Sequence, residues 1–380
     1  MREGWEYKKL GEVAVIQSGY TPSSADLSNN GTVPYYKVGD MNAVGNEKYL
    51  HYSSAFVDAS FKSYPKGSVV FPKNGAAIAT NKKRILSQPS VVDLNTAVLI
   101  PIKNLNIEFL YYWICKIDFR NITRRGAVPT LDIKTLMQFD FPTPSPTVQS
   151  HIVSELDMLS GLIAKHEEQL KAYDELAQSI FFDMFGDPVE NEKGWEVKKL
   201  GEIGTIITGS TPSTRDENNY SSNDYNFFKP SDIANDTISL LTESEYFISE
   251  HAYEQSRKLP IGSVLVTCIG IIGKIGILQK EATCNQQINA VKPNDNSTPL
   301  YLAYCISGLR VMLENIANAP VVPIINKGQF SNIQIPLPPL LLQQSFAEKI
   351  EAIERQKERI RQSMAEVKTL FDSRMDYYFN

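Results

Sequence analysis

The chain is poor in the residues from which most catalytic and metal centres are built. Its 380 residues include only four cysteines and four histidines. The cysteines form no Cys-x-x-Cys pair and the histidines lack metal-ligand spacing, which argues against a zinc site and against a disulfide framework. We therefore expect no metal, no cofactor and a reducing, cytoplasmic location.

Common catalytic motifs are also missing. The sequence has no Gly-x-Ser-x-Gly nucleophile elbow and no Asn-Pro-Pro-Tyr tetrapeptide of the kind that holds a flipped base during amino-methylation. The stretch Gly270–Gly276 looks like a phosphate loop, but its spacing is wrong, and Ile275 stands where Ser or Thr would hold magnesium. We expect a glycine-rich turn there and a chain that is not itself an enzyme.

Long apolar runs are absent as well. The stretch Ile261–Leu278 is apolar, but its glycines and Lys274 predict strands and turns rather than a membrane span. The first residues do not have the pattern of a signal peptide. These features predict a protein without a membrane partner.

What the chain does contain is a long internal repeat. The opening GWEYKKLGE at Gly4–Glu12 returns as GWEVKKLGE at Gly194–Glu202. Each half also closes alike, because FPTP at residues 141–144 matches IPLP at residues 335–338 and a glutamine follows in both. A repeat of this length is a whole domain rather than a solenoid unit. The divergence between these landmarks favours two modules tuned to different targets, although drift after a duplication would leave the same trace.

Each half divides into a mixed globule and a long helix. Runs of β-branched and aromatic residues bounded by Gly, Pro and Asn predict short strands, as in Ser68–Phe71 and Ser263–Val266. Phe109–Ile114 and Leu300–Cys305 predict one helix inside each globule. At roughly 140 residues, each globule is long enough to bury a core of its own.

The second part of each half carries a heptad seam. Apolar positions follow at alternating steps of four and three from Ile152 to Met184, and the same phase runs from Phe346 to Tyr378. Two equal stripes in one chain most simply pack on each other as an antiparallel coiled coil with pseudo-twofold symmetry. His166 and Lys357 interrupt the seam, and we interpret them as a register device or as partly exposed polar positions.

The predicted fold is therefore α+β, with two mixed α/β globules separated by two long pairing helices. The expected boundaries are residues 1–142 and 191–336 for the globules, 143–190 for the central helix and 337–380 for the C-terminal helix.

Charge is distributed unevenly along the chain. The total of −5 divides into +5 for residues 1–140, −7 for 141–193, −3 for 194–338 and 0 for 339–380. The basic first globule is suited to contacts with DNA phosphates, although a solvated surface explains its clusters equally well. The candidate DNA contacts are Lys37, Lys73, Asn81, Lys82, Lys83, Arg84, Arg124 and Arg125 in the first globule, and Arg215, Lys229, Lys274, Gln286 and Lys327 in the second.

Together these features resemble the specificity subunit of Type I restriction-modification enzymes. The resemblance covers essentially the whole chain and rests on the duplicated openings, the duplicated Pro-x-Pro entries to the helices, and the segments Phe181–Pro188 and Asn285–Asn289. It implies two target-recognition domains, each reading one half of a bipartite target in double-stranded DNA. It also implies two methyltransferase subunits docked along the helices, and it leaves open whether restriction subunits join them.

Two other classes of function remain open from the sequence. An enzyme with a site between the globules would need a convergent acid, base or nucleophile, which the motifs do not offer. A purely structural spacer would not need two full globules. Binding of S-adenosylmethionine by the purified chain would favour the enzyme.

Overall fold

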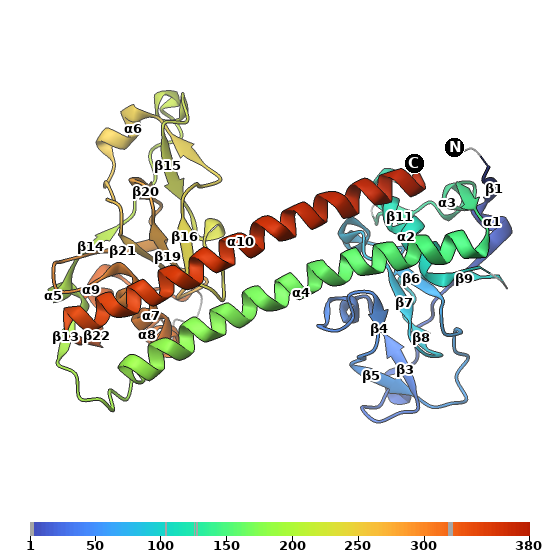
Figure 1. Cartoon of the computed structure of the whole chain (residues 1–380), viewed down its shortest axis with the longest axis horizontal. Coiled ribbons are helices and arrows are strands. Elements are labelled where there is room, and N and C mark those ends of the chain that lie inside the picture. Colours follow the sequence, from blue (N-terminus) through green and yellow to red (C-terminus); the bar gives the residue numbers. More distant parts are fainter. Residues whose placement is uncertain (1–3, 103–104, 125, 127, 318–321) are drawn as a thin grey trace. The chain divides into compact units, whose positions relative to one another are not determined.

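A computed structural model describes residues 4–102, 105–124, 126, 128–317 and 322–380 (Figure 1). The chain divides into two compact units, one made of residues 1–165 with 363–380 and the other of residues 166–362. Each unit contains one mixed globule together with parts of both long helices, so the repeat in the sequence is a repeat of domains.

The globule of the first unit is built on a five-stranded mixed sheet. Val69, Val70 and Phe71 lie at its centre and are fully buried, as expected for a continuous run of strand-forming apolar residues. The strand order is β2 (Ala14–Ser18), β9 (Thr96–Pro101), β6 (Val69–Pro72), β7 (Arg84–Leu86) and β4 (Tyr49–Leu50), with only β4 and β7 parallel.

Three smaller sets of strands complete this globule. The first strand pairs with the last, so the domain begins and ends at one edge. The sets are β5 (Ala55–Val57), β3 (Val33–Tyr36) and β8 (Val91–Val92); β1 (Glu6–Lys9) with β12 (Asp140–Thr143); and the hairpin β10 (Thr123–Arg124) with β11 (Thr130–Leu131).

The second unit repeats this topology. Its five-stranded sheet has the order β14 (Gly204–Thr208), β21 (Ile288–Pro293), β18 (Val264–Thr267), β19 (Ile275–Leu278) and β16 (Ser239–Leu241). The smaller sets are β17 (Phe247–Ile248), β15 (Tyr225–Phe228) and β20 (Ala282–Cys284), and β13 (Val197–Lys199) with β22 (Gln334–Pro336). Gly270 and Gly273, at φ +78° and +81°, form the turn between β18 and β19, which confirms the predicted glycine-rich turn.

Short helices cover the sheets. The two predicted from sequence are present as α2 (Ile107–Lys116), capped by the Asn106 side chain, and α7 (Pro299–Gly308), capped by Thr298. The other α-helices are α1 (Leu10–Val13), α3 (Ile133–Met137), α5 (Leu200–Ile203), α6 (Glu250–Gln255), α8 (Arg310–Ile316) and α9 (Lys327–Ser331). The 3-10 turns are η1 (Ser24–Asp26), η2 (Val38–Asn42), η3 (Ala76–Thr80), η4 (Phe119–Ile122), η5 (Glu217–Tyr220) and η6 (Pro230–Asp232).

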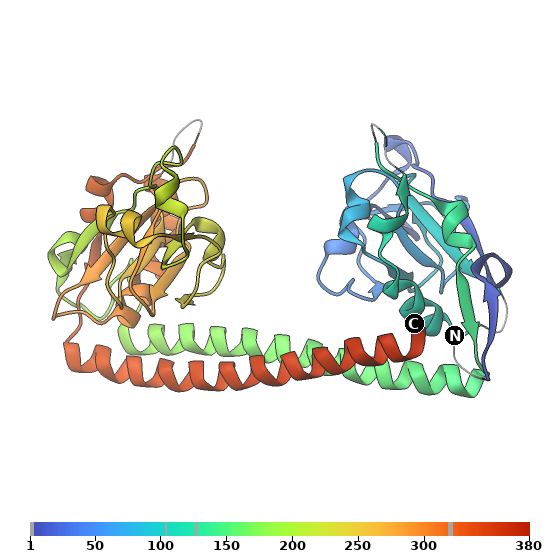
Figure 2. The ribbon, with the colours of Figure 1, turned by 90° about the horizontal axis from the view of Figure 1, so that it is seen from above.

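The two long helices are α4 (Pro146–Phe185) and α10 (Leu340–Phe379), each of 40 residues. Gly186 follows α4 at φ +79°, the left-handed position that commonly ends a helix. Within each unit the helices run antiparallel (Figure 2), with Glu155 near Arg374 in the first unit and Asp174 near Lys357 in the second. The antiparallel helix pair predicted from the heptads is confirmed within each unit.

The predicted seam is correct near the helix starts and drifts near the end of α4. Ile152, Leu156, Phe346 and Ile350 are buried as expected. Near the end of α4, Phe181 and Phe185 are buried, whereas the predicted Ile180 and Met184 are half-buried. The cause is that a straight helix has 3.6 residues per turn, so its buried face rotates slowly away from a 3.5-residue repeat. Near the end of α4 this rotated face, with Phe181 and Phe185, packs into the core of the globule.

A buried glutamine ties each long helix to its globule. Gln149 accepts a hydrogen bond from the backbone N–H of Asn106 at 3.2 Å and donates to the Pro144 carbonyl at 2.9 Å. Gln343 accepts from the N–H of Thr298 at 2.9 Å and donates to the Asn296 and Pro338 carbonyls. The glutamine that follows each Pro-x-Pro in the sequence therefore joins a long helix to the start of α2 or α7.

The described residues contain neither a candidate membrane-spanning helix nor a candidate metal site. None of the helices there has both the length and the apolarity needed to cross a bilayer. No cluster of three or more His, Cys, Asp or Glu side chains in that part of the chain is placed to hold a metal ion.

Candidate nucleic-acid interface

In the first unit, a polar rim forms where β2 and β6 end and β9 begins. The Lys73 ammonium donates to the Ser18 hydroxyl at 2.6 Å, and the Asn74 side-chain amide donates to the Asn95 side-chain oxygen at 3.5 Å. Burial lowers the pKa of Lys73, and Asp93 opposes this shift by favouring the charged form. The rim places one cation among hydrogen-bonding groups, which is the chemistry that a DNA groove requires.

The β10–β11 hairpin joins this rim, because Asn74 forms a β-bridge with Thr130. The Arg124 guanidinium on this hairpin is 59% exposed and pairs with Asp132 at 2.7 Å. The hydrogen bond from Arg124 lowers the pKa of the Asp132 carboxyl to about 2. Arg124 is thus held in place while donors remain for a phosphate. Arg125 lies outside the described residues.

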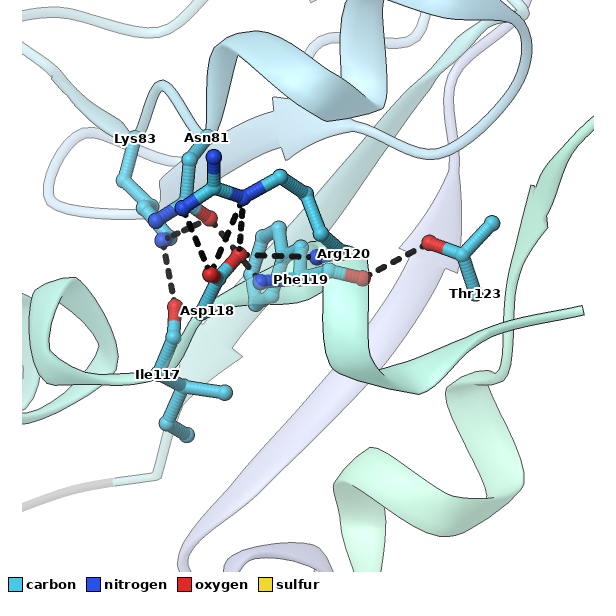
Figure 3. A network of polar contacts seen from close by, with 7 residues as sticks. All are labelled: Asn81, Lys83, Ile117, Asp118, Phe119, Arg120 and Thr123. Atoms are coloured by element: carbon cyan, nitrogen blue, oxygen red, sulfur yellow. Dashed lines mark hydrogen bonds and ion pairs between the residues drawn. The ribbon is translucent and has the colours of Figure 1, made fainter.

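Lys83 has a different environment from the one its sequence cluster suggests (Figure 3). Its side chain is buried, donates to the Asn81 side-chain oxygen at 2.6 Å and to the Ile117 carbonyl at 2.7 Å, and lies 4.0 Å from the Phe119 ring centre. Burial lowers its pKa to about 8. A phosphate has no access to this ammonium, so the structure gives no support to Lys83 as a DNA contact.

We predict a measurable pH effect of Lys83 on stability. The folded chain releases this proton near pH 8 and the unfolded chain near the ordinary value of 10.5, so the unfolded state binds more protons between these values. Stability should therefore rise by on the order of 1–3 kcal/mol across this window. Urea unfolding of a Lys83→Met variant should lack this rise, while Lys82→Met keeps it. An unchanged rise in Lys83→Met would contradict the assignment.

The neighbours of Lys83 mainly organise the η2 turn. Asn81 adopts a left-handed conformation and its side chain also accepts from the Phe119 N–H. The Arg84 guanidinium donates to the Lys83 and Met41 carbonyls at 2.7 and 2.9 Å, and the Lys82 ammonium contacts the Asn42 side-chain oxygen. Lys82 and Arg84 thereby hold η2 against β7. Lys37, which precedes η2, is exposed.

In the second unit, too, one candidate lysine is buried and others are accessible to solvent. Lys274 is buried and donates to the Pro230 and Ile233 carbonyls at 2.9 Å each, so it holds η6 and is withdrawn from solvent. The Lys229 ammonium lies 3.1 Å from the Tyr246 ring centre. Arg215 is exposed.

The rim of the second unit carries amide side chains. The exposed Gln286 accepts from the Thr211 hydroxyl at 2.5 Å. The Asn289 amide donates to the Ile325 carbonyl at 3.2 Å, and the Ile325 N–H donates to the Cys268 carbonyl at 2.9 Å. This contact brings the start of α9, with the exposed Lys327, toward the same end of the sheet.

Several polar residues of the two rims were not among the sequence candidates. They are Ser18, Asn74 and Asn95 in the first unit, and Thr211 and Arg257 in the second, where the Arg257 guanidinium donates to the Thr208 carbonyl at 2.7 Å. Most of them lie just after or just before a sheet strand. A polar residue next to the end of a predicted strand is therefore a sequence signal for the rim, and clusters of basic residues do not contain it.

One cavity of the first unit offers poor nucleophiles. It measures about 890 Å³, and Cys115 is the thiol that lines it. Burial raises the pKa of this thiol, which keeps it protonated and unreactive. Ion pairs of Lys48 with Asp157 and of Lys116 with Asp376 engage both lysines that line the cavity. This cavity therefore offers no activated thiol.

Comparison with known proteins agrees with this architecture. The family model described as Type I restriction modification DNA specificity domain matches residues 2–172 and again 192–369. The MjaIX specificity subunit of a Type I restriction enzyme from Methanocaldococcus jannaschii is 25% identical over 391 residues, which cover 90% of this chain and 85% of that protein.

Two solved structures share the fold. A Type I restriction-modification S subunit from M. genitalium aligns with TM-score 0.58 and 12% identity over 99% of this chain and 96% of its own. A chain from a study of complex assembly and conformational transition in the Type I system aligns with TM-score 0.59 and 20% identity over 100% and 98%. With a specificity domain matched in each half, this chain belongs to the Type I restriction-modification DNA specificity family.

Proposed function

We propose that this chain is the non-catalytic DNA-recognition subunit of a Type I restriction-modification enzyme and that each globule reads one half of a bipartite target. The observation that carries the proposal is a duplicated sheet topology with two chemically different rims. The first rim presents Lys73 and Arg124, and the second presents Gln286 and Lys327. A shared frame with unlike polar groups is what reading two unlike half-sites requires.

The rim chemistry suggests how contacts divide between phosphates and bases. Among the sequence candidates, we select for phosphate contacts the exposed or half-exposed cations that neither donate to a backbone carbonyl, as Arg84 does, nor lie on an aromatic ring, as Lys229 does. They are Lys37, Lys73, Lys82, Arg124, Arg215 and Lys327. The Gln286 amide has the donor and acceptor pair that matches an adenine edge in the major groove. Lys83 and Lys274 leave this set because carbonyls inside the domains hold their ammonium groups.

The net charge of the chain and the exposed apolar side chains of its long helices support methyltransferase subunits as partners. A chain with net charge −5 gains little from counterion release unless a partner adds positive surface. We propose that two methyltransferase subunits supply that surface by docking along the long helices. Apolar side chains exposed on these helices support the docking, namely Met158, Leu162, Leu176 and Leu370 at 66%, 39%, 46% and 49% exposure.

Neutralising two rim cations should weaken DNA binding without changing specificity. In a complex with methyltransferase, Lys73→Gln with Arg124→Gln should reduce affinity for matched and mismatched sites in parallel, by about tenfold. The slope of log K against log salt should fall by about 2, because each phosphate contact contributes about 0.9. Fluorescence anisotropy over a salt series measures both quantities.

Lys66→Gln is the matched control for this experiment. Lys66 is exposed and lies before β6, at the opposite end of the strand from Lys73. The Lys66→Gln variant should have the same DNA affinity and the same slope of log K against log salt as the unmodified chain. Equal slopes for the control and the double variant would remove Lys73 and Arg124 from the interface.

A further inference from the structure

The buried lysine of the heptad seam has two acidic partners in the second unit. The Lys357 side chain is only 5% exposed, and its ammonium lies 2.6 Å from Asp174 on α4 and 2.5 Å from Glu354 on α10. Of the two interpretations made from sequence, a register device fits Lys357, whereas half-buried His166 is a partly exposed polar position. Removing one member of a buried pair costs far more than the pair itself contributes.

A second cross-helix pair lies in the first unit. The Arg374 guanidinium on α10 lies 2.5 Å from one Glu155 oxygen on α4 and donates to the other at 2.9 Å. The Tyr378 hydroxyl donates to the same carboxylate at 2.5 Å. The hydrogen bond from Arg374 lowers the pKa of Glu155, so the carboxylate stays charged. In both cross-helix pairs, the acid is on α4 and the cation is on α10.

The internal repeat does not repeat these charges: the positions of α4 and α10 that are equivalent in the repeat carry different residues at both ion pairs. At the positions of α4 equivalent to Lys357 and Arg374, the sequence has Ile163 and Ile180. At the positions of α10 equivalent to Asp174 and Glu155, it has Lys368 and Lys349. Over its whole length α4 carries seven acidic and two basic residues, whereas α10 carries seven of each.

This asymmetry gives each pairing of like helices an electrostatic cost. In a pair of two α4 helices with the observed register, Asp174 and Glu155 would meet Ile163 and Ile180 of the other copy. In a pair of two α10 helices, Lys357 and Arg374 would meet Lys368 and Lys349. Polar seam residues commonly select partners in this way, by penalising the alternatives.

We propose that these two ion pairs determine which helix pairs with which, so that α4 accepts α10 and rejects a second copy of α4. The selection matters during synthesis, because α4 is complete before α10 exists and neighbouring chains on one messenger present their own α4 helices. Unpaired Asp174 and Glu155 keep that premature association unfavourable until α10 arrives. Two unlike specificity domains thereby stay on one scaffold, whatever DNA they read.

The test moves the cations to the other helix in the full-length chain. The transfer variant combines Lys357→Ile, Arg374→Ile, Ile163→Lys and Ile180→Arg, which leaves composition and net charge unchanged. Pairing of α4 with α4 now restores each ion pair twice, whereas pairing within one chain leaves both acids without a cation. By sedimentation equilibrium at micromolar concentration we expect a dimer for the transfer variant and a monomer for the unmodified chain.

The matched control is Glu168→Gln with Gln362→Glu. It exchanges charge between equivalent exposed positions outside the seam, and it should remain monomeric. A transfer variant that is monomeric and melts at the temperature of the unmodified chain would overturn the proposal.

A charge-reversal cycle decides the matter if the transfer variant does not fold. In a Glu354→Gln background, Asp174→Lys and Lys357→Asp should each lower the melting temperature by about 10 °C. The double variant should recover at least half of that loss, because the pair is rebuilt with reversed signs. Absence of recovery would show that the pair makes no selective contact.

Discussion

Replacing the second globule, residues 191–336, with the equivalent domain of another family member is expected to change one half of the methylated DNA sequence and to leave the other half unchanged. The exchange is practical because the chain enters and leaves this globule on paired strands, with Val197 opposite Pro336. The polar groups that differ between the rims travel with the graft, while Lys73 and Arg124 remain. Sequencing of methylated bases in cells with the modified gene reports both half-sites at once.

The graft must preserve the contact between the globule and the helices. Tyr301 and Tyr304 of α7 lie 4.9 Å from Phe185 and 5.2 Å from Phe346, measured between ring centres. A donor domain with aromatic residues at these two positions keeps that packing. The reciprocal exchange of residues 1–142 is the control and should change only the other half-site. A graft that alters both halves, or neither, would refute the assignment of one half-site to each globule.

Phe346→Ala is expected to destabilise the second unit by about 3–5 kcal/mol, the range measured for removal of a buried aromatic ring. Phe346 is fully buried at the start of α10, and its ring centre lies 5.6 Å from Phe181 and 5.3 Å from Phe185. The substitution leaves a cavity where the helix pair meets the globule. Urea unfolding followed by circular dichroism measures the loss.

Leu341→Ala is the matched control on the same helix. Leu341 is 80% exposed, so its truncation should change stability by less than about 0.5 kcal/mol. Equal losses for the two variants would mean that the aromatic cluster does not anchor α10 to the globule.

The sequence was sufficient for those features that depend on local pattern. The duplicated openings, the heptads from Ile152 and Phe346, and the helices α2 and α7 all appear in the structure where they were expected. Periodicity and capping act over a few residues, so a single sequence contains the information that they need. The heptad prediction fails near the end of α4, where Phe181 is buried in place of the predicted Ile180. There the helix packs against the globule, and a heptad pattern describes only the contact between two helices.

Only the tertiary structure decided which basic residues face solvent. Lys83 stands between Lys82 and Arg84 in a cluster that suggests phosphate binding, yet its ammonium is bound by the carbonyl of Ile117, 34 residues away. Lys274 lies in a glycine-rich turn and is held by the carbonyls of Pro230 and Ile233. A cation becomes structural or functional according to the acceptors that the fold brings to it, and such long-range contacts leave no periodic trace in the chain. For the same reason, the sequence alone marked Lys357 as an interruption of the seam, and the fold supplied Asp174 as its partner.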